Sequence, residues 1–145
     1  MADFVHNISK GAVAEKFRDG AANGLMLLLK VAEADATMKD YDTVAALLAG
    51  TPDEANFTNY VRKTGLTGTI TVDDTNDRVD VDMPDQTWTS AGGGTNNTLT
   101  DLVIAYEESA SDSGRIPLTN HDFAITTDGS DLTATLNASG FFRAS

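Results

Sequence analysis

The fold is decided by the stretch Thr69-Ile70-Thr71-Val72, Asp73-Asp74-Thr75-Asn76-Asp77 and Arg78-Val79-Asp80-Val81-Asp82-Met83. Apolar and polar residues alternate in its first and last segments, so each strand turns one face inward and one face to water. The aspartate and asparagine residues between them are typical of a turn, because short polar side chains cap the local backbone. The pattern predicts a β-hairpin whose inward side chains are Ile70, Val72, Val79, Val81 and Met83.

The rest of the C-terminal two-thirds consists of short, threonine-rich segments separated by turn signals. Alternation and β-branched content predict strands at residues 56–63, 87–89, 99–106, 116–118, 123–126 and 132–136. Asp128-Gly129 predicts a hairpin turn between the last two strands. Gly92-Gly93-Gly94 predicts a flexible loop rather than a phosphate cradle, because a helix does not follow it.

The N-terminal part predicts a short helix that ends near Asp19. Asn7 or Ser9 supplies its cap, and Val13 and Phe17 lie four residues apart on one face. The apolar run 24–31 that follows predicts a buried central strand.

A second short helix is predicted over residues 40–49. Asp40 or Asp42 is its expected cap, and Gly50 ends it. These elements together predict a β-dominated α+β fold, an antiparallel β-sandwich or barrel-like body with two short N-terminal helices. We expect a single domain, 1–145, in which residues 1–50 pack on the antiparallel body 56–145.

Composition excludes several classes of function. The chain of 145 residues carries a net charge of −12, which disfavours binding to nucleic acid or to an anionic membrane. The acidity either provides solubility or favours docking on a basic partner. No cysteine is present, so disulfide and thiolate chemistry are excluded. Residues 1–10 lack the pattern of a signal peptide, and the longest apolar run, 25–29, is too short to span a membrane.

Two groups of polar residues suggest a calcium site and a catalytic pair, but neither group has the spacing that such a site requires. One group is a cluster of aspartates dense enough to suggest calcium binding: Asp73, Asp74, Asp77, Asp80, Asp82 and Asp85. However, no glycine and no closing glutamate fall at the positions that a calcium-binding loop requires. Alternation places Asp80 and Asp82 on the solvent side, where carboxylates protect a sheet edge. His121-Asp122 resembles a catalytic pair, but adjacent strand residues point to opposite faces and no nucleophile elbow accompanies them. We therefore expect no catalytic residue, no metal and no cofactor.

Four residues are candidates for an interface. Trp88, the only tryptophan, is either a core anchor or an interface hot spot. Phe141 and Phe142 stand near the C-terminus, followed by Arg143, and they either fold back on the body or insert into a neighbour. The sequence leaves both alternatives open.

Seven stretches together resemble a family of small structural proteins encoded by tailed bacteriophages, notably those of actinobacteria. The stretches are Asn7 to Gly11, Glu33 to Thr37, Asp73 to Asp82, Pro84 to Trp88, Pro117 to Phe123, Asp128 to Asp131 and Gly140 to Ser145. The resemblance covers nearly the whole chain and implies a virion component without enzymatic activity.

The expected function is therefore that of a non-enzymatic virion structural protein. The first hypothesis is a capsid accessory or decoration protein that stabilises the particle, and the alternative is a minor tail or tail-tip protein that contacts host glycans. A third is a carbohydrate-active enzyme of the virion. The expected partners are major capsid or tail proteins and further copies of the chain, without nucleic acid or membrane. Synthesis in the host cytoplasm and assembly into the virion are the expected localisation.

Overall fold

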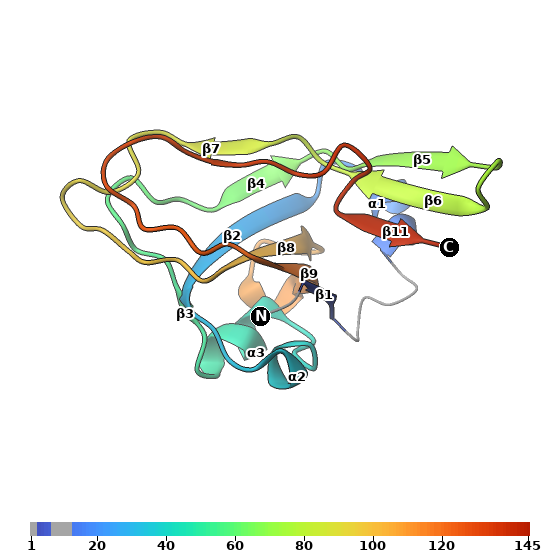
Figure 1. Cartoon of the computed structure of the whole chain (residues 1–145). Helices are drawn as coiled ribbons and strands as arrows, with labels where there is room; N and C mark the ends of the chain where they lie inside the picture. Colours follow the sequence, from blue (N-terminus) through green and yellow to red (C-terminus); the bar gives the residue numbers. More distant parts are fainter. Residues whose placement is uncertain (1–2, 7–12) are drawn as a thin grey trace.

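The computed structural model describes residues 3–6 and 13–145 of the chain (Figure 1). These residues form a β-dominated α+β fold with short helices and antiparallel sheets, which confirms the predicted fold class. The helices are α1 (Val13–Asp19), α2 (Asp35–Met38), α3 (Val44–Ala49) and the 3-10 turn η2 (Asp112–Gly114). The strands are β1 (Phe4–Val5), β2 (Gly24–Val31), β3 (Asp53–Glu54), β4 (Lys63–Leu66), β5 (Thr69–Asp73), β6 (Arg78–Asp82), β7 (Gln86–Trp88), β8 (Asp101–Glu107), β9 (Arg115–Asp122), β10 (Leu132–Ala134) and β11 (Phe142–Ala144).

The largest sheet has six strands, in the order β1-β9-β8-β2-β3, with β4 on the same edge of β2 as β3. Strand β2 pairs with β8 over six consecutive residues, and β8 pairs with β9 over most of its length. A two-stranded sheet joins β10 to β7, and a three-stranded sheet has the order β11-β6-β5.

Strand β2 lies between two layers, which explains its continuous apolar run. Leu25, Leu27 and Leu29 pack with α2 and α3 on one face, whereas Met26 and Leu28 belong to a core on the other face. Figure 1 shows α2 and α3 below the large sheet and β7 above it. The sequence prediction of a buried central strand is confirmed, since residues 24 to 29 are all buried.

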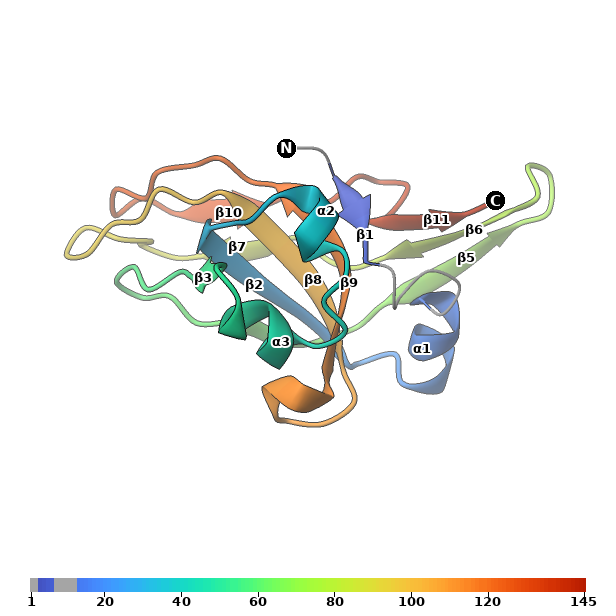
Figure 2. The same ribbon diagram turned by 90° about the horizontal axis from the view of Figure 1, so that it is seen from below.

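The predicted hairpin is confirmed, and it projects from the body. Strands β5 and β6 pair from Thr69 with Asp82 to Asp73 with Arg78, and β11 pairs with the other side of β6. Figures 1 and 2 show these strands extending away from the large sheet, beyond α1. We call β5, β6 and β11 together the arm.

Burial falls along the arm, and this corrects two sequence predictions. Val81 is 0% exposed at the root, but Val72 is 57% exposed although it lies on the same face. The alternation pattern predicted Val72 inward, and that prediction is wrong because the arm extends past the core. Asp80, predicted on the solvent side, is only 8% exposed because β11 brings Arg143 over it.

Two predicted strands are also wrong. Residues 56–63 do not form a strand, since Asn59 adopts φ = 70°, and β4 begins only at Lys63. Residues 123–126 hold a single bridge, Thr98 with Thr126, and the amide of Ile125 donates to the Phe123 carbonyl in a tight turn. Strand β10 therefore pairs with β7 rather than forming a hairpin across Asp128-Gly129.

Helix α3 (Val44–Ala49) is shorter than the helix predicted over residues 40–49. Helix α3 is capped by Thr43, whose hydroxyl accepts from the Ala46 amide, so neither Asp40 nor Asp42 is the cap. The separate helix α2 was not expected. In α1, Val13 and Phe17 are buried as predicted, whereas the expected caps Asn7 and Ser9 lie outside the described residues.

Candidate functional site

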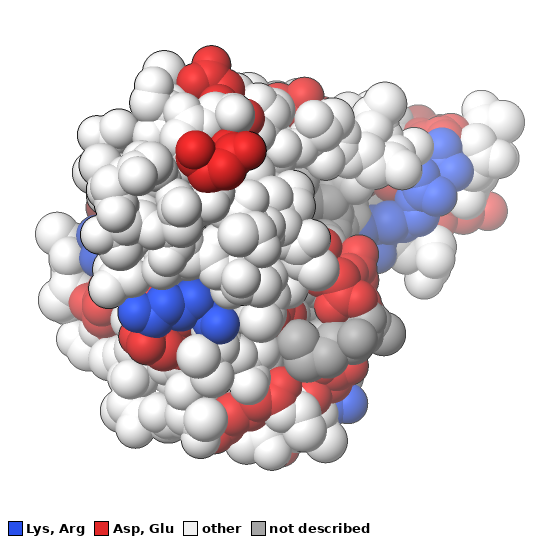
Figure 3. Space-filling model, turned by 60° about the vertical axis from the view of Figure 1, so that its left-hand side comes forward, with Lys and Arg blue, Asp and Glu red and all other residues white. Residues whose placement is uncertain are grey.

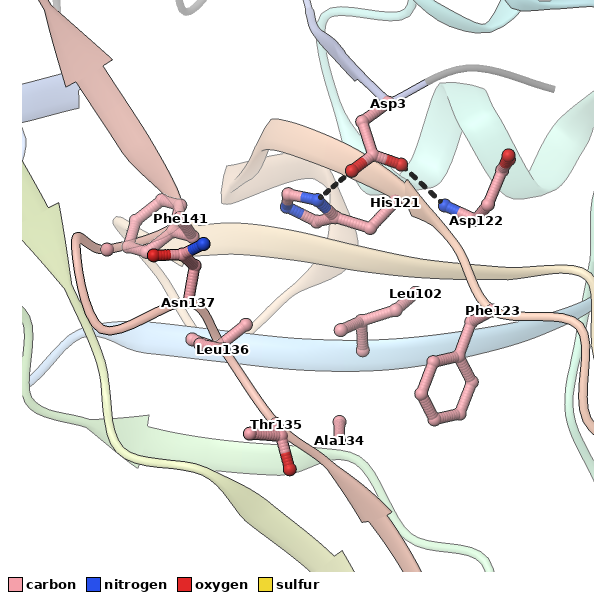
Figure 4. Close-up of a pocket in the computed structure, with 11 residues that line it drawn as sticks. Asp3, Leu102, His121, Asp122, Phe123, Ala134, Thr135, Leu136, Asn137 and Phe141 are labelled. Atoms are coloured by element: carbon pink, nitrogen blue, oxygen red, sulfur yellow. Dashed lines mark hydrogen bonds and ion pairs between the residues drawn. The ribbon is translucent and has the colours of Figure 1, made fainter.

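A pocket of about 430 Å³ lies where the end of β9 faces the segment that connects β10 to β11 (Figure 4). Its floor is apolar and includes Leu102, Phe123 and Leu136, while polar side chains from Asp3, His121, Asp122 and Asn137 surround it. The lining contains two carboxylates and no lysine or arginine. Its chemistry therefore suits neutral or cationic groups better than anions.

The polar side of the pocket is tied to β9 by Asp3. One Asp3 carboxylate oxygen lies 3.2 Å from His121 Nδ1, and the other accepts from the Asp122 amide at 2.9 Å. His121 Nε2 lies 2.9 Å from the Thr119 hydroxyl. His121 and Asp122 are adjacent on β9, as the sequence predicted, and the carboxylate beside the imidazole comes from Asp3, 118 residues away.

Thr119, His121 and Asp3 stand in the hydrogen-bonding order of a nucleophile, a base and an acid. The Thr119 side chain is only 2% exposed, however, and it does not line the pocket. A substrate in the pocket does not reach that hydroxyl in this conformation. The three residues therefore act in the described structure as a connection between the N-terminal segment and β9.

Beside these residues, two polar side chains are buried. Asp101 and Asn120 are both 0% exposed, and the Asn120 side-chain amide donates to Asp101 Oδ1 at 2.7 Å. Burial raises the pKa of Asp101, and the amide opposes that rise because it stabilises the charged form. Asp101 pairs with Asp122 across β8 and β9, so the pair lies next to the pocket without lining it.

The predicted acidic cluster does not converge on a single point. Asp82 accepts from the adjacent Met83 amide, and Asp85 accepts from the amide of Leu136, 51 residues later, so each carboxylate binds backbone. Within residues 3–6 and 13–145, no group of three or more histidine, aspartate and glutamate side chains is arranged to hold a metal ion.

Two members of the cluster, Asp73 and Asp80, form ion pairs on one face of the arm. Arg78 Nε lies 3.0 Å from Asp73 and 3.4 Å from Asp80, and Arg143 Nε lies 2.6 Å from Asp80. The Arg143 hydrogen bond holds the pKa of Asp80 below its usual range. Figure 3 shows basic side chains on the projecting part of the molecule with acidic ones beside them.

A second ionic network surrounds η2. Arg62 contacts Glu54 at 2.6 Å and Asp112 at 2.5 Å, and Arg115 contacts Asp112 and Glu107. The hydrogen bond to Glu54 contributes most to raising the pKa of Arg62. These charges are paired inside the chain and hold η2 to the segment after β3.

The four interface candidates separate into two pairs. Trp88 is 1% exposed and donates from Nε1 to the Val61 carbonyl at 2.7 Å, and Phe141 is 8% exposed and packs edge-on against Phe17. Both are core residues, so Phe141 folds back on the body. Phe142 is partly buried against the same core and Arg143 is exposed on β11. An interface role for these last two stays a prediction.

The Gly92-Gly93-Gly94 loop is held in place rather than free. The Gly92 amide donates to the Thr58 carbonyl at 2.9 Å and the Gly93 amide donates to the Asn96 side chain at 2.7 Å. Gly92 and Gly93 adopt φ of 94° and 87°, and a side chain at Gly92 would collide with Asn96. The glycines thus serve a tight turn, which corrects the expectation of a flexible loop.

Comparisons of the chain with protein-family models, with curated proteins and with solved structures find no match. Among the helices of the described part of the chain, none is long and apolar enough to cross a membrane.

Proposed function

We propose that this protein is a non-enzymatic structural component of a bacteriophage virion, a capsid accessory protein that stabilises the particle. The observation that carries the proposal is the arm, a three-stranded sheet that projects from the body. Its apolar face continues past the core to the exposed side chain of Val72. Exposed apolar surface and open strand edges are features that proteins use to bind other chains.

Charge and sequence resemblance support the same assignment. The net charge of −12 suits a protein that docks on a basic surface while the acidic remainder faces solvent. The stretches that resemble virion proteins include Asp73 to Asp82, which contains the hairpin turn and β6, and the terminal Gly140 to Ser145, which contains β11.

A non-enzymatic role also fits the pocket beside His121. The hydroxyl nearest this histidine belongs to Thr119, which is 2% exposed, and the His121 ring also contacts Asp3. Hydrolysis of a cell-wall polymer by the purified protein, abolished by His121→Ala, would contradict this part of the proposal.

Location in the particle tests the assignment directly. The protein is labelled, particles are assembled in infected cells, and the label is imaged by electron microscopy. Label distributed over the shell is the expected result, and label at the tail tip would favour the minor tail alternative. Particles without any label would overturn a virion function.

Comparing particles assembled with and without the protein tests whether it stabilises the particle. Particles assembled without the protein should release their DNA at a lower temperature than complete particles, because many copies bound to the native lattice stabilise it by mass action. Restoring the purified protein should restore the release temperature. Equal release temperatures with and without the protein would contradict the accessory role.

A further inference from the structure

Strand β5 is an open edge of the arm. It pairs with β6 on one side through Thr69 to Asp73, and no strand in residues 3–6 and 13–145 pairs with its other side. Natural edge strands usually carry a proline, an inward charge, a lysine or a bulge that prevents pairing with another chain. The sequence Thr-Ile-Thr-Val-Asp has no proline and no lysine, and its pairing with β6 shows no register shift.

The two faces of the arm differ in chemistry. Ile70 and Val72 of β5 share one face with Val79 and Val81 of β6, because these residues are paired across the hairpin. The ion pairs of Asp73, which lies opposite Arg78, occupy the other face. An added strand would therefore extend an apolar face on one side and a polar face on the other.

The edge is complementary to itself. An antiparallel pair of two β5 strands centred on Thr71 places Thr69 opposite Asp73 of the second copy and Ile70 opposite Val72. Such a register keeps the apolar residues on one face, because paired positions differ by an even number. The only charged residue of β5 is Asp73, so no like charges meet directly across the pair.

We propose that this chain self-associates by antiparallel pairing of β5 with β5 of a second copy around a two-fold axis at Thr71. The product is a continuous six-stranded sheet, β11-β6-β5 followed by the same strands in reverse. Val72, now 57% exposed, gains an apolar neighbour in Ile70 of the second copy. This inference goes beyond the proposed function, because it concerns the purified protein and needs no particle.

The proposed pair brings the hairpin tip, which contains Asp74 and Asp77, nearest the root of the other arm, where α1 packs against β5. The two basic side chains of α1 already have partners within the chain, since Lys16 pairs with Glu108 and Arg18 pairs with Glu15. The net charge of −12 on each copy opposes association. Added salt screens that repulsion and should strengthen the dimer.

Cysteine cross-linking tests the register, since the chain has no native cysteine. In the proposed pair the two Thr71 Cα atoms lie about 4.5 to 5.5 Å apart, which is within reach of a disulfide. The two Thr69 Cα atoms lie four residues out of register and are too distant. Both threonines are exposed, so either substitution leaves the fold intact.

Under mild oxidation, Thr71→Cys should form a covalent dimer, and Thr69→Cys should stay monomeric under the same conditions. The double variant Thr69→Cys with Asp73→Cys should cross-link again, because these positions face each other in the pair. Equal cross-linking of the two single variants, or no cross-linking of Thr71→Cys, would overturn the proposal.

A second measurement uses matched exposed valines. Val72 and Val61 are 57% and 62% exposed, but only Val72 lies on the arm. Sedimentation at increasing concentration and salt should show a dimer for the unmodified chain and for Val61→Asp, and loss of that dimer for Val72→Asp. A chain that stays monomeric at every concentration, or equal behaviour of the two variants, would contradict self-pairing of β5.

Discussion

Strands β2 and β5 are both antiparallel strands of this chain, but their surroundings are opposite. Strand β2 is covered on one face by α2 and α3 and on the other by the main core, and Leu25 to Leu29 are all 0% exposed. Strand β5 has no fully buried residue, and no strand in the described part of the chain pairs with its outer edge. The difference shows that β2 holds the body of the molecule together, whereas β5 exposes its side chains and its edge.

The comparison is tested most strongly by placing a carboxylate in each strand. Leu27→Asp buries an unpaired charge in β2 and should destabilise the protein by about 4 kcal/mol or more. Val72→Asp, at an exposed site of β5, should change the free energy of unfolding of the monomer, measured at low protein concentration, by less than about 0.5 kcal/mol. Urea unfolding measures both values.

If Leu27→Asp does not fold, Leu27→Ala replaces it, with an expected cost of about 3 kcal/mol from lost burial and the cavity. Similar effects of the β2 and β5 substitutions would show that the arm is as much a part of the core as β2.

The pH dependence of stability tests the packing on the side of the large sheet that α2 and α3 cover. His6 is 0% exposed, and burial lowers its pKa from 6.5 to about 4, although the nearby backbone of Met38 and Tyr41 opposes the shift. The folded chain therefore holds His6 neutral, while the unfolded chain binds a proton below pH 6.5. Its contribution to stability is present above pH 6.5 and is lost as the pH falls toward 4.

Between pH 7 and pH 5 the loss from His6 should be about 2 kcal/mol. Comparing the chain with His6→Gln by urea unfolding at several pH values isolates this part of the pH dependence. Identical slopes for the two proteins would show that His6 does not titrate differently in the folded and unfolded states.

Within the arm, the boundary between core and free surface lies between neighbouring valines of β6. Val81 is 0% exposed and Val79 is partly exposed on the same face. Val81→Ala should therefore cost about 2 kcal/mol, and Val79→Ala less than about 1 kcal/mol. Thermal unfolding of the two variants compares the contributions of Val81 and Val79 to stability. Equal shifts in Tm would show that no boundary between core and free surface lies between them.

The smallest expected effect concerns the ion pair that joins β11 to β6. The hydrogen bond from Arg143 lowers the pKa of Asp80, so this pair adds stability at neutral pH that is lost as the pH falls into the acid range. Arg143→Gln should raise the pKa of Asp80, as followed by carboxyl chemical shifts. An unchanged titration of Asp80 would show that Arg143 does not hold this carboxylate.

Local pattern predicted the parts of the fold that depend on local contacts. The apolar run of β2 and the alternation of β5 and β6 both led to the observed strands, because period and composition reflect burial on two faces or on one. The same alternation failed for Val72, since pattern shows which face a side chain takes but not how far the core extends.

The pocket was less predictable because distant parts of the chain build it. The sequence indicates Asp122 as the neighbour of His121, but the carboxylate that contacts the imidazole belongs to Asp3, 118 residues away. Alternation places Asp80 in solvent, because nothing near it in the sequence indicates that Arg143, 63 residues later, covers it. The sequence does carry a signal for the irregular segment around residue 59, because a non-glycine residue at positive φ is often asparagine, as at Asn59.

The burial of Trp88 gives the molecule an optical reporter of its own. This single tryptophan lies in the core between β7 and the Val61 carbonyl, with the Lys63 ammonium 5.2 Å from the ring centroid. Its indole emission is therefore that of an enclosed, hydrogen-bonded ring, and it shifts to longer wavelength only when the layer above β2 separates. Association through the arm leaves this environment untouched, so fluorescence distinguishes opening of the body from docking of the arm.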